Sequence, residues 1–283
     1  MRTFLALALC AGTATAQEAV LRGAYVWEND DPAFGGFSGI EVASDGSQFF
    51  AISDRGHLAT GRLLRDQGVI SGVALEGLVR LRGRARVPLP HAESDSEGLA
   101  LGPDGRLFIS FEWTHGLREL LSEIGETGPL LVAEAFGDMQ TNSSLEAVAI
   151  DAEGALYTIP ERSGRAARPF PVYRLKDSDW DMPFVIPRRG AFLVSGADIG
   201  PDGRFYLLER DFLGLGFRSR VRRFEMDGTG ETTLLETRLF AHDNLEGISV
   251  WQDSDSLVMT LISDDNFRAL QRTEIVEYLL TQD

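Results

Sequence analysis

The chain has 283 residues, of which 43% are hydrophobic and 25% charged, and its 27 basic and 43 acidic residues give a formal net charge of −16. This composition excludes global disorder and a collagen-like chain. The negative charge argues against general binding to nucleic acids or anionic membranes. One cysteine and four histidines without zinc-ligand spacing argue against a disulfide scaffold and a catalytic zinc.

Residues 1–16 have the pattern of a secretory signal peptide. Arg2 precedes the apolar run Phe4–Ala11, and Ala14-Thr15-Ala16 is the small-residue motif at which such signals are cleaved. The apolar run is too short to remain as a membrane anchor. We therefore expect a periplasmic or secreted bacterial protein whose mature part, residues 17–283, is a single domain.

Five segments of the chain repeat one pattern: a polar residue, a small residue, an apolar strand, a turn, a second apolar strand and an acid. The segments are Phe37–Gly56, Ser96–Trp113, Ser144–Ser163, Ser195–Phe212 and Asn244–Phe267. Their small residues are aligned as Gly39, Gly98, Ala147, Ala197 and Gly247. These positions are 59, 49, 50 and 50 residues apart. Such regular spacing indicates a repeated structural unit.

Each repeat is predicted to be a β-hairpin followed by two weaker strands, because turn residues such as Pro103-Asp104-Gly105 separate short apolar runs. In the second repeat the segment Leu130–Ala135 supplies the fourth strand, and only Leu117–Ile124 has a helical period. Four strands in about 50 residues, repeated radially, predict an all-β propeller with five four-stranded blades. Six blades remain possible because the first interval is longer. Pairing of Ala19–Trp27 with Thr273–Leu280 is expected to close the ring.

The propeller pattern gathers polar side chains at one end of the central channel, because the first strand of a hairpin begins where the second ends. The residues at the start of the first strands are Ser38, Glu97, Glu146, Gly196 and Glu246. The residues at the end of the second strands are Asp54, Glu112, Glu161, Glu209 and Asp264. So many carboxylates cannot all ionise together without raised pKa values or a cation. Their oxygen ligands suit a divalent cation, Ca²⁺ in particular.

A purely structural interpretation also explains these acids, as acceptors of backbone N–H groups between blades or as partners of the arginines that follow several of them. The sequence contains no G-x-S-x-G nucleophile motif and no phosphate-binding P-loop or dinucleotide motif.

The chain resembles the phytase-like family, described by the label "esterase-like activity of phytase". The matching motifs are Gly36-Phe37-Ser38-Gly39, Ile52-Ser53-Asp54-Arg55-Gly56, Asp95-Ser96-Glu97-Gly98-Leu99, Ser144-Leu145-Glu146-Ala147, Asn244-Leu245-Glu246-Gly247 and Ser263-Asp264-Asp265-Asn266. They span nearly all of the mature chain. The resemblance implies a secreted β-propeller assigned to phosphate-ester hydrolysis.

These observations predict a metal-dependent hydrolase with a small-molecule phosphate ester as its substrate, since a cation would offset the repulsion between an acidic mouth and a phosphate. The predicted cation ligands are Glu97, Glu146, Glu246, Asp54 and Asp264. The predicted phosphate-binding residues are Arg55, Arg162 and Arg210. The predicted general acid or base is Glu112 or Glu161. The alternatives are a lactonase or carboxylester hydrolase on a similar propeller, and a non-catalytic periplasmic binding or scaffold propeller.

Overall fold

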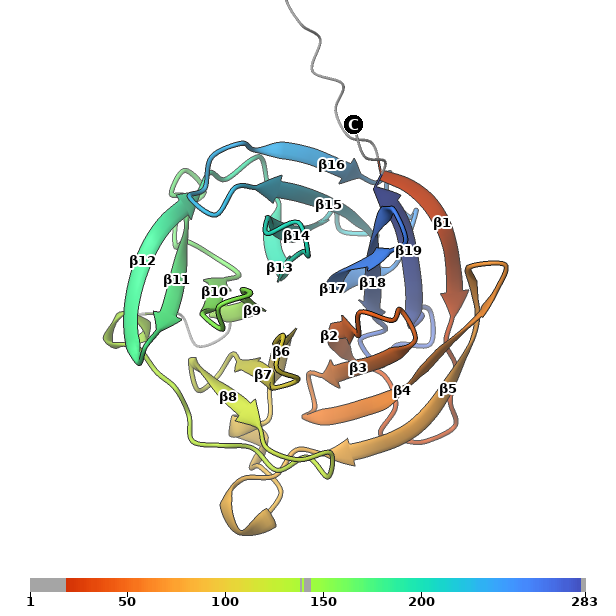
Figure 1. Ribbon diagram of the computed structural model, residues 1–283, viewed down its shortest axis with the longest axis horizontal. Coiled ribbons are helices and arrows are strands. Elements are labelled where there is room, and N and C mark those ends of the chain that lie inside the picture. Colours follow the sequence, from red (N-terminus) through yellow and green to blue (C-terminus); the bar gives the residue numbers. More distant parts are fainter. Residues whose placement is uncertain (1–18, 138, 140–143, 281–283) are drawn as a thin grey trace, which may run out of the picture.

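The computed structural model describes residues 19–137, 139 and 144–280, so the predicted signal peptide lies outside the described residues. Five antiparallel sheets surround a central channel, as the sequence predicts, and six blades are excluded (Figure 1). In the described part of the chain, no helix is long and apolar enough to cross a membrane.

The strands follow the same order in each blade, from the channel outward. The innermost strands are β2 (Phe37–Val42), β6 (Ser96–Leu101), β9 (Leu145–Ile150), β13 (Leu193–Ile199) and β17 (Asn244–Asp253). The second strands are β3 (Gln48–Ser53), β7 (Leu107–Phe111), β10 (Leu156–Pro160), β14 (Phe205–Phe212) and β18 (Ser256–Asp264). The third strands are β4 (His57–Asp66), β8 (Gly116–Leu120), β11 (Phe170–Lys176), β15 (Phe217–Phe224) and β19 (Glu274–Leu280). The outermost strands are β5 (Val69–Arg80), β12 (Asp179–Ile186), β16 (Thr232–Glu236) and β1 (Ala19–Val26).

The two ends of the described chain meet in the fifth blade. Strand β1 pairs with β19 along its length, with Ala19 opposite Leu280 and Val26 opposite Glu274. The first strand in the sequence therefore supplies the outermost strand of the last blade, which confirms the predicted closure.

The second blade departs from the prediction in two ways. Its sheet has three strands, and in place of the fourth the expected segment Leu130–Ala135 contributes only a bridge between Leu131 and Leu117. The helical period over Leu117–Ile124 is misleading, because Gly116–Leu120 forms strand β8 against β7. Three short 3₁₀ helices, Arg84–Arg86, His91–Glu93 and Glu134–Phe136, lie in the loops around this blade.

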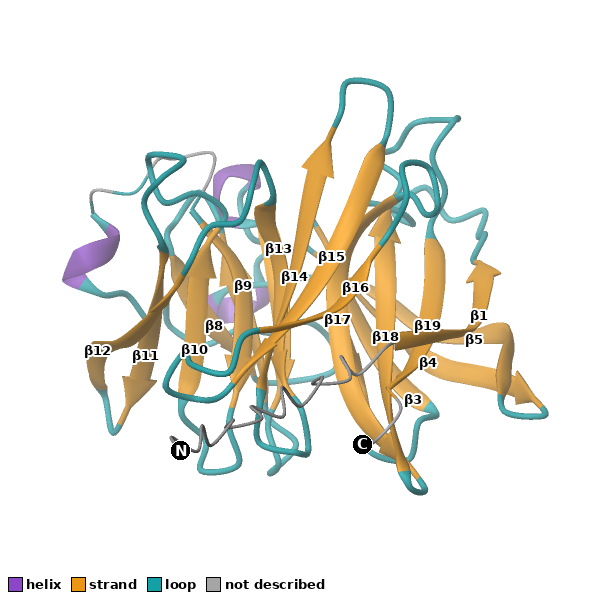
Figure 2. Ribbon diagram, turned by 90° about the horizontal axis from the view of Figure 1, so that it is seen from above, coloured by secondary structure: helices purple, strands orange, loops and turns teal. Residues whose placement is uncertain are grey.

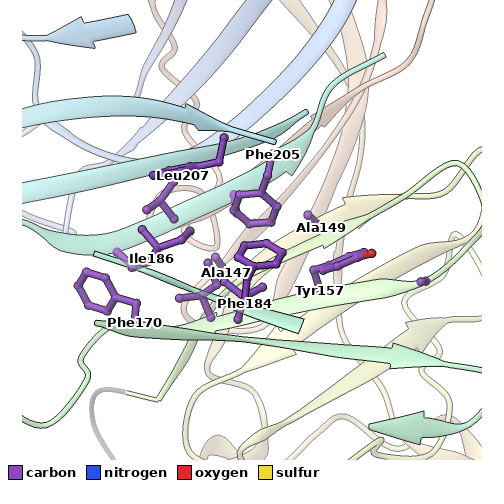
Figure 3. Packing of buried hydrophobic residues seen from close by; sticks show 14 residues of the cluster. Ala147, Ala149, Tyr157, Phe170, Phe184, Ile186, Phe205 and Leu207 are labelled. Atoms are coloured by element: carbon purple, nitrogen blue, oxygen red, sulfur yellow. The ribbon is translucent and has the colours of Figure 1, made fainter. Parts of the chain in front are cut away.

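Apolar side chains fill the spaces between neighbouring blades. Between the third and fourth blades, Phe170 and Ile186 pack in one cluster with Phe205 and Leu207, and all four are fully buried (Figure 3). Burying one such side chain stabilises the fold by about 1.5–3 kcal/mol. Each blade has two faces, and each face packs against a different neighbouring blade. The apolar core is therefore continuous around the ring.

Hydrogen bonds from polar side chains join neighbouring inner strands near the end of the channel at which these strands end. The carboxylate of Asp198 accepts the N–H of Val250 at 2.6 Å, and the hydroxyl of Ser249 accepts the N–H of Val42 at 3.0 Å. Burial raises the pKa of Asp198 to about 6. A hollow of about 760 Å³ lies here, lined in part by hairpin turns. Asp198 and Ser249 thus have structural partners, whereas Glu41 Oε1, in the lining of the same hollow, is buried without a hydrogen-bond partner among the described residues.

Candidate active site at the mouth of the channel

A β-bulge recurs at the start of all five inner strands. The register between the first and second strands shifts there in every blade, for example between Val194 and Gly196 in β13 and between Leu245 and Gly247 in β17. The bulge leaves one residue of the inner strand outside the regular pairing in four blades, and Glu97 and Gly98 in the second blade. Such a bulge re-aims the side chain of the unpaired residue. The residues at this position are Ser38, Glu97, Glu146, Ser195 and Glu246. We call this end of the channel the mouth.

The residue that follows the bulge lies where neighbouring inner strands approach most closely. A Cβ atom on Gly196 would lie 2.5 Å from the carbonyl oxygen of Glu246, and one on Gly247 would lie 2.7 Å from the nitrogen of Ile40. Gly196, rather than the predicted Ala197, is therefore the small residue of the fourth repeat. The assignment of Gly196 to the mouth set is wrong, and Ser195 takes that place.

The second set of mouth residues is shifted by one in the same blade. Arg210 pairs with Leu193 in the register in which Asp264 pairs with Asn244, so Arg210 and not Glu209 is the fourth member. The members are Asp54, Glu112, Glu161, Arg210 and Asp264. A shift of one residue along a strand turns the side chain to the other face of the sheet.

Glu209 therefore lies inside the fourth blade instead of at the mouth. Its carboxylate is fully buried and accepts hydrogen bonds from Arg220 Nε at 2.8 Å and Arg222 Nη2 at 2.6 Å. The structural interpretation of the acids is correct for this residue.

Arg210 is the centre of a second ion-pair group, which we call the arginine cluster and which also contains Glu146, Glu161 and Glu246. Its guanidinium lies 3.3 Å from Glu146 Oε1 and 3.4 Å from Glu161 Oε1, and it also contacts Glu246. Burial opposes the charge of Arg210, but the surrounding carboxylates outweigh this effect and raise its pKa. Arg210 thus supplies, on this side of the mouth, the positive charge that the sequence analysis assigned to a metal ion.

The second blade carries a different group, the carboxyl cluster of Asp95, Glu97 and Glu112. One carboxylate oxygen from each of the three lies within 4.8 Å of the others. No ion pair reaches them from any described residue. Burial, then repulsion from Asp95 and Glu161, raises the pKa of Glu112 to about 7. Burial, then repulsion from neighbouring acids, also raises the pKa of Glu97.

Asp54 and Asp264 lie at the mouth between the ends of the ring's first and fifth blades. Burial, followed by the charge of Asp264, raises the pKa of Asp54 to about 7, and Asp54 Oδ1 is buried without a hydrogen-bond partner among the residues that the structure describes. Burial also raises the pKa of Asp264 to about 6, although Asp264 accepts the N–H of Asn266 at 2.6 Å.

The five predicted cation ligands therefore do not form one coordination shell. Glu146 and Glu246 are held by Arg210, whereas Glu97 groups with Glu112 and with Asp95, which the sequence analysis did not select. The available signal for Asp95 was its place directly before the Ser-Glu-Gly motif of the second repeat. Three carboxylate oxygens at this separation are the hard donors that suit Ca²⁺ or Mg²⁺, so the carboxyl cluster fits such an ion.

The predicted arginines separate as well. Arg162 donates from Nε to Glu161 at 2.9 Å, and together with Arg210 it lines a hollow of about 490 Å³ at the mouth. The guanidinium carbon of Arg55 instead lies 3.2 Å from the centre of the Phe267 ring. Arg268, which the sequence analysis did not select, lines the same hollow as Arg162.

Comparison with known proteins gives a family and a fold. The family model described as "Phytase-like: Esterase-like activity of phytase" matches residues 32–267. A luciferin-regenerating enzyme is similar in structure at 11% identity and a TM-score of 0.52, over 92% of this chain and 98% of that chain. A glucose dehydrogenase is similar at 10% identity and a TM-score of 0.51, over 92% of this chain and 100% of that chain.

A hydrazine synthase chain from Kuenenia stuttgartiensis also matches, at 15% identity and a TM-score of 0.44. That match covers 90% of this chain and 65% of the synthase chain, so this chain spans less than two thirds of that protein. No curated protein sequence matches. At these identities the structural likeness shows the propeller fold alone.

Proposed function

Because the chain belongs to the phytase-like family described by esterase-like activity of phytase, we propose that it is a hydrolase of small phosphate esters that depends on a divalent cation, Ca²⁺ in particular. The observation that carries the proposal is the carboxyl cluster. Three crowded carboxyl groups, of which Glu112 is buried and Asp95 and Glu97 are half-buried, have no ion pair with any described residue, which is costly unless a cation or protons compensate them. They lie at the same mouth as an arginine-lined hollow.

The residues of the mouth divide the work of such a reaction. Asp95, Glu97 and Glu112 would hold the cation, which when bound supplies Lewis-acid polarisation and a water of lowered pKa. Arg162 has two terminal nitrogens that make no hydrogen bond in the described part of the chain, so they are available to a substrate anion. Arg210 holds its neighbouring glutamates in place.

If Glu112 is a cation ligand, a different residue must act as the general acid or base that the sequence analysis assigned to Glu112 or Glu161. Asp54 meets the requirement, because its pKa of about 7 lets it exist in both protonation states near neutral pH and its Oδ1 has no partner. Glu161 is bound by Arg162 and Arg210, so its role is to orient these two arginines.

The proposal is tested by hydrolysis of p-nitrophenyl phosphate with added Ca²⁺ and with EDTA. We expect release of nitrophenol that needs the ion, and a loss of about 100-fold or more in Glu97→Gln. Glu153→Gln is the matched control, because Glu153 is an exposed acid paired with Lys176 at the opposite end of the channel. Equal rates in Ca²⁺ and EDTA, or an unchanged rate in Glu97→Gln, would contradict the proposal.

The word "esterase-like" in the family description favours a second candidate, hydrolysis of carboxyl esters or lactones. Hydrolysis of p-nitrophenyl acetate without hydrolysis of the phosphate would select it. No activity on either substrate or on phytate would leave a binding or scaffold protein as the function.

We also propose that the chain is exported, because residues 1–16 have the composition of a cleavable signal. Cell fractionation followed by N-terminal sequencing should find the protein outside the cytoplasm, beginning at Gln17. A cytoplasmic protein that begins at Met1 would contradict this proposal.

A further inference from the structure

The hollow at the mouth has two walls of different chemistry. One wall is polar and is formed by Arg162, Arg210, Asn244, Asn266 and Arg268. The other wall is apolar and is formed by Ala191, Leu193, Phe212 and Phe217. Pockets that bind small molecules commonly combine an apolar lining with a few polar groups that fix orientation.

The positive charge of the polar wall is only partly neutralised. The two acids that line the hollow already have arginine partners: Glu161 is bound by Arg162 and Arg210, and Asp211 is bound by Arg218 at 2.8 Å. Arg268 is exposed and has no ion pair within the described part of the chain. The guanidinium groups of Arg162 and Arg268 are therefore the donors available to an anion.

Two residues of the apolar wall, Phe212 and Phe217, belong to the hairpin of β14 and β15, which extends beyond the neighbouring strands in the side view (Figure 2). The rings of Phe212 and Phe217 lie with their centroids 4.9 Å apart. The side chain of Phe212 is 56% exposed, and the turn that follows carries Leu215 at 85% exposure. Apolar side chains left exposed beside a hollow are a common feature of ligand-binding surfaces.

We infer that this hollow binds an ester with one anionic group and one apolar group of at least benzene size. Arg162 and Arg268 bind the anionic group, and Phe212 and Phe217 contact the apolar group. The inference rests on the proposed function, and it narrows the substrate class of the same site. Phytate does not fit this class, because it has no apolar group. Its many negative charges would also be repelled by the acids of the mouth, and only two arginines would be available to bind them.

The test measures binding without turnover, by calorimetry with phenylphosphonate and methylphosphonate in EDTA. Phenylphosphonate should bind about tenfold or more tightly than methylphosphonate, since the ring adds apolar contact area. Phe217→Ala should abolish this preference. Arg268→Gln should weaken both ligands about tenfold or more, whereas Arg204→Gln, an exposed arginine paired with Glu225 away from the hollow, should change neither.

Equal binding of the two phosphonates to the unaltered protein would overturn the inference, as would an Arg268→Gln variant with unchanged affinity or tighter binding of phytate than of phenylphosphonate. Failure of the proposed function is a different result. A protein that binds phenylphosphonate selectively but hydrolyses no ester keeps the inference, and one that hydrolyses aromatic and small phosphate esters equally well keeps only the function.

Discussion

The carboxyl cluster and the arginine cluster occupy the same mouth but solve the problem of crowded negative charge differently. Glu97 and Glu246 hold equivalent bulge positions, yet Glu246 contacts the guanidinium of Arg210, whereas no ion pair reaches Glu97 from the described residues. The fourth blade places an arginine where the other blades place an acid. Equivalent positions in a ring of repeats can therefore differ in how their negative charge is neutralised. Some of the acids have an arginine partner within the protein, and the others need a proton or a bound cation.

The largest expected effect on stability comes from a substitution in the arginine cluster. Arg210→Gln leaves the buried Glu146 and Glu246 without their arginine partner, so the free energy of unfolding in EDTA should fall by about 3–5 kcal/mol at pH 8. Urea unfolding measures the change. Arg204→Gln is the control, because that exposed pair should contribute about 0–1 kcal/mol. A loss in Arg210→Gln no larger than in the control would end the distinction between the two clusters.

The pH dependence of stability tests the part that lacks a cation. Asp54 and Glu112 have folded-state pKa values raised to about 7, chiefly by burial. The stability linked to their protons is fully present below the ordinary carboxyl pKa near 4 and is lost as the pH rises through about 7. In EDTA the free energy of unfolding should fall by about 2–4 kcal/mol between pH 5 and pH 8.

Added Ca²⁺ should reduce this loss at pH 8 and have little effect at pH 5, where Glu112, with its pKa of about 7, retains its proton. Urea unfolding at both pH values, with and without the ion, measures the difference. Stability that rises with pH in EDTA would contradict the raised pKa values.

The sharpest comparison uses the two equivalent glutamates. Glu97→Gln removes a carboxyl group that neighbouring acids repel and should stabilise the protein in EDTA at pH 8 by about 1 kcal/mol. Glu246→Gln removes a partner of Arg210 and should destabilise the protein by a similar amount. Thermal unfolding measures both. Changes of the same sign in the two variants would show that the clusters do not differ.

The smallest expected effect concerns an arginine outside both clusters. Arg55→Ala loses the contact with the Phe267 ring and should cost about 0.5–1 kcal/mol. Phosphonate binding in the same variant should be unchanged, because Arg55 does not line the hollow. A large loss of binding would restore the role that the sequence analysis gave to Arg55.

The ring could be predicted from the sequence because its determinants are local and repeated. Turn residues and short apolar runs recur every 50 residues or so, and each recurrence specifies one hairpin. The same logic predicted that Glu97, Glu146 and Glu246 would start inner strands, and the structure places all three at the mouth.

The errors arose where a one-residue choice has no strong local signal. Gly196 and Ala197 are both small, and only the close approach of the neighbouring inner strand distinguishes them. The same one-residue shift assigned Glu209 to the second mouth set in place of Arg210, which the sequence analysis had selected only as a phosphate-binding residue. Adjacent residues of a strand face opposite sides of the sheet. The helical period at Leu117–Ile124 failed for a related reason, because pairing with β7 overrides a short local pattern.

Which acids share a cation could not be read from spacing at all. The pairing of Arg210 with Glu146 and Glu246 joins three different blades, and it depends on how the ring closes. The carboxylates of Asp95, Glu97 and Glu112 come together where the register between β6 and β7 shifts, and the spacing of these residues in the sequence does not show that shift.

The pairing of β1 with β19 also constrains the order in which the molecule is assembled. Strand β1 is made before the other described strands of the ring and its partner β19 after them, so the fifth blade cannot be completed until β19 has been made. Until then β1 has no sheet to join, and β17, β18 and β19 lack their outer edge. Circular permutants that begin at Phe37 and place β1 directly after β19 would turn this last long-range step into a local one and should refold faster.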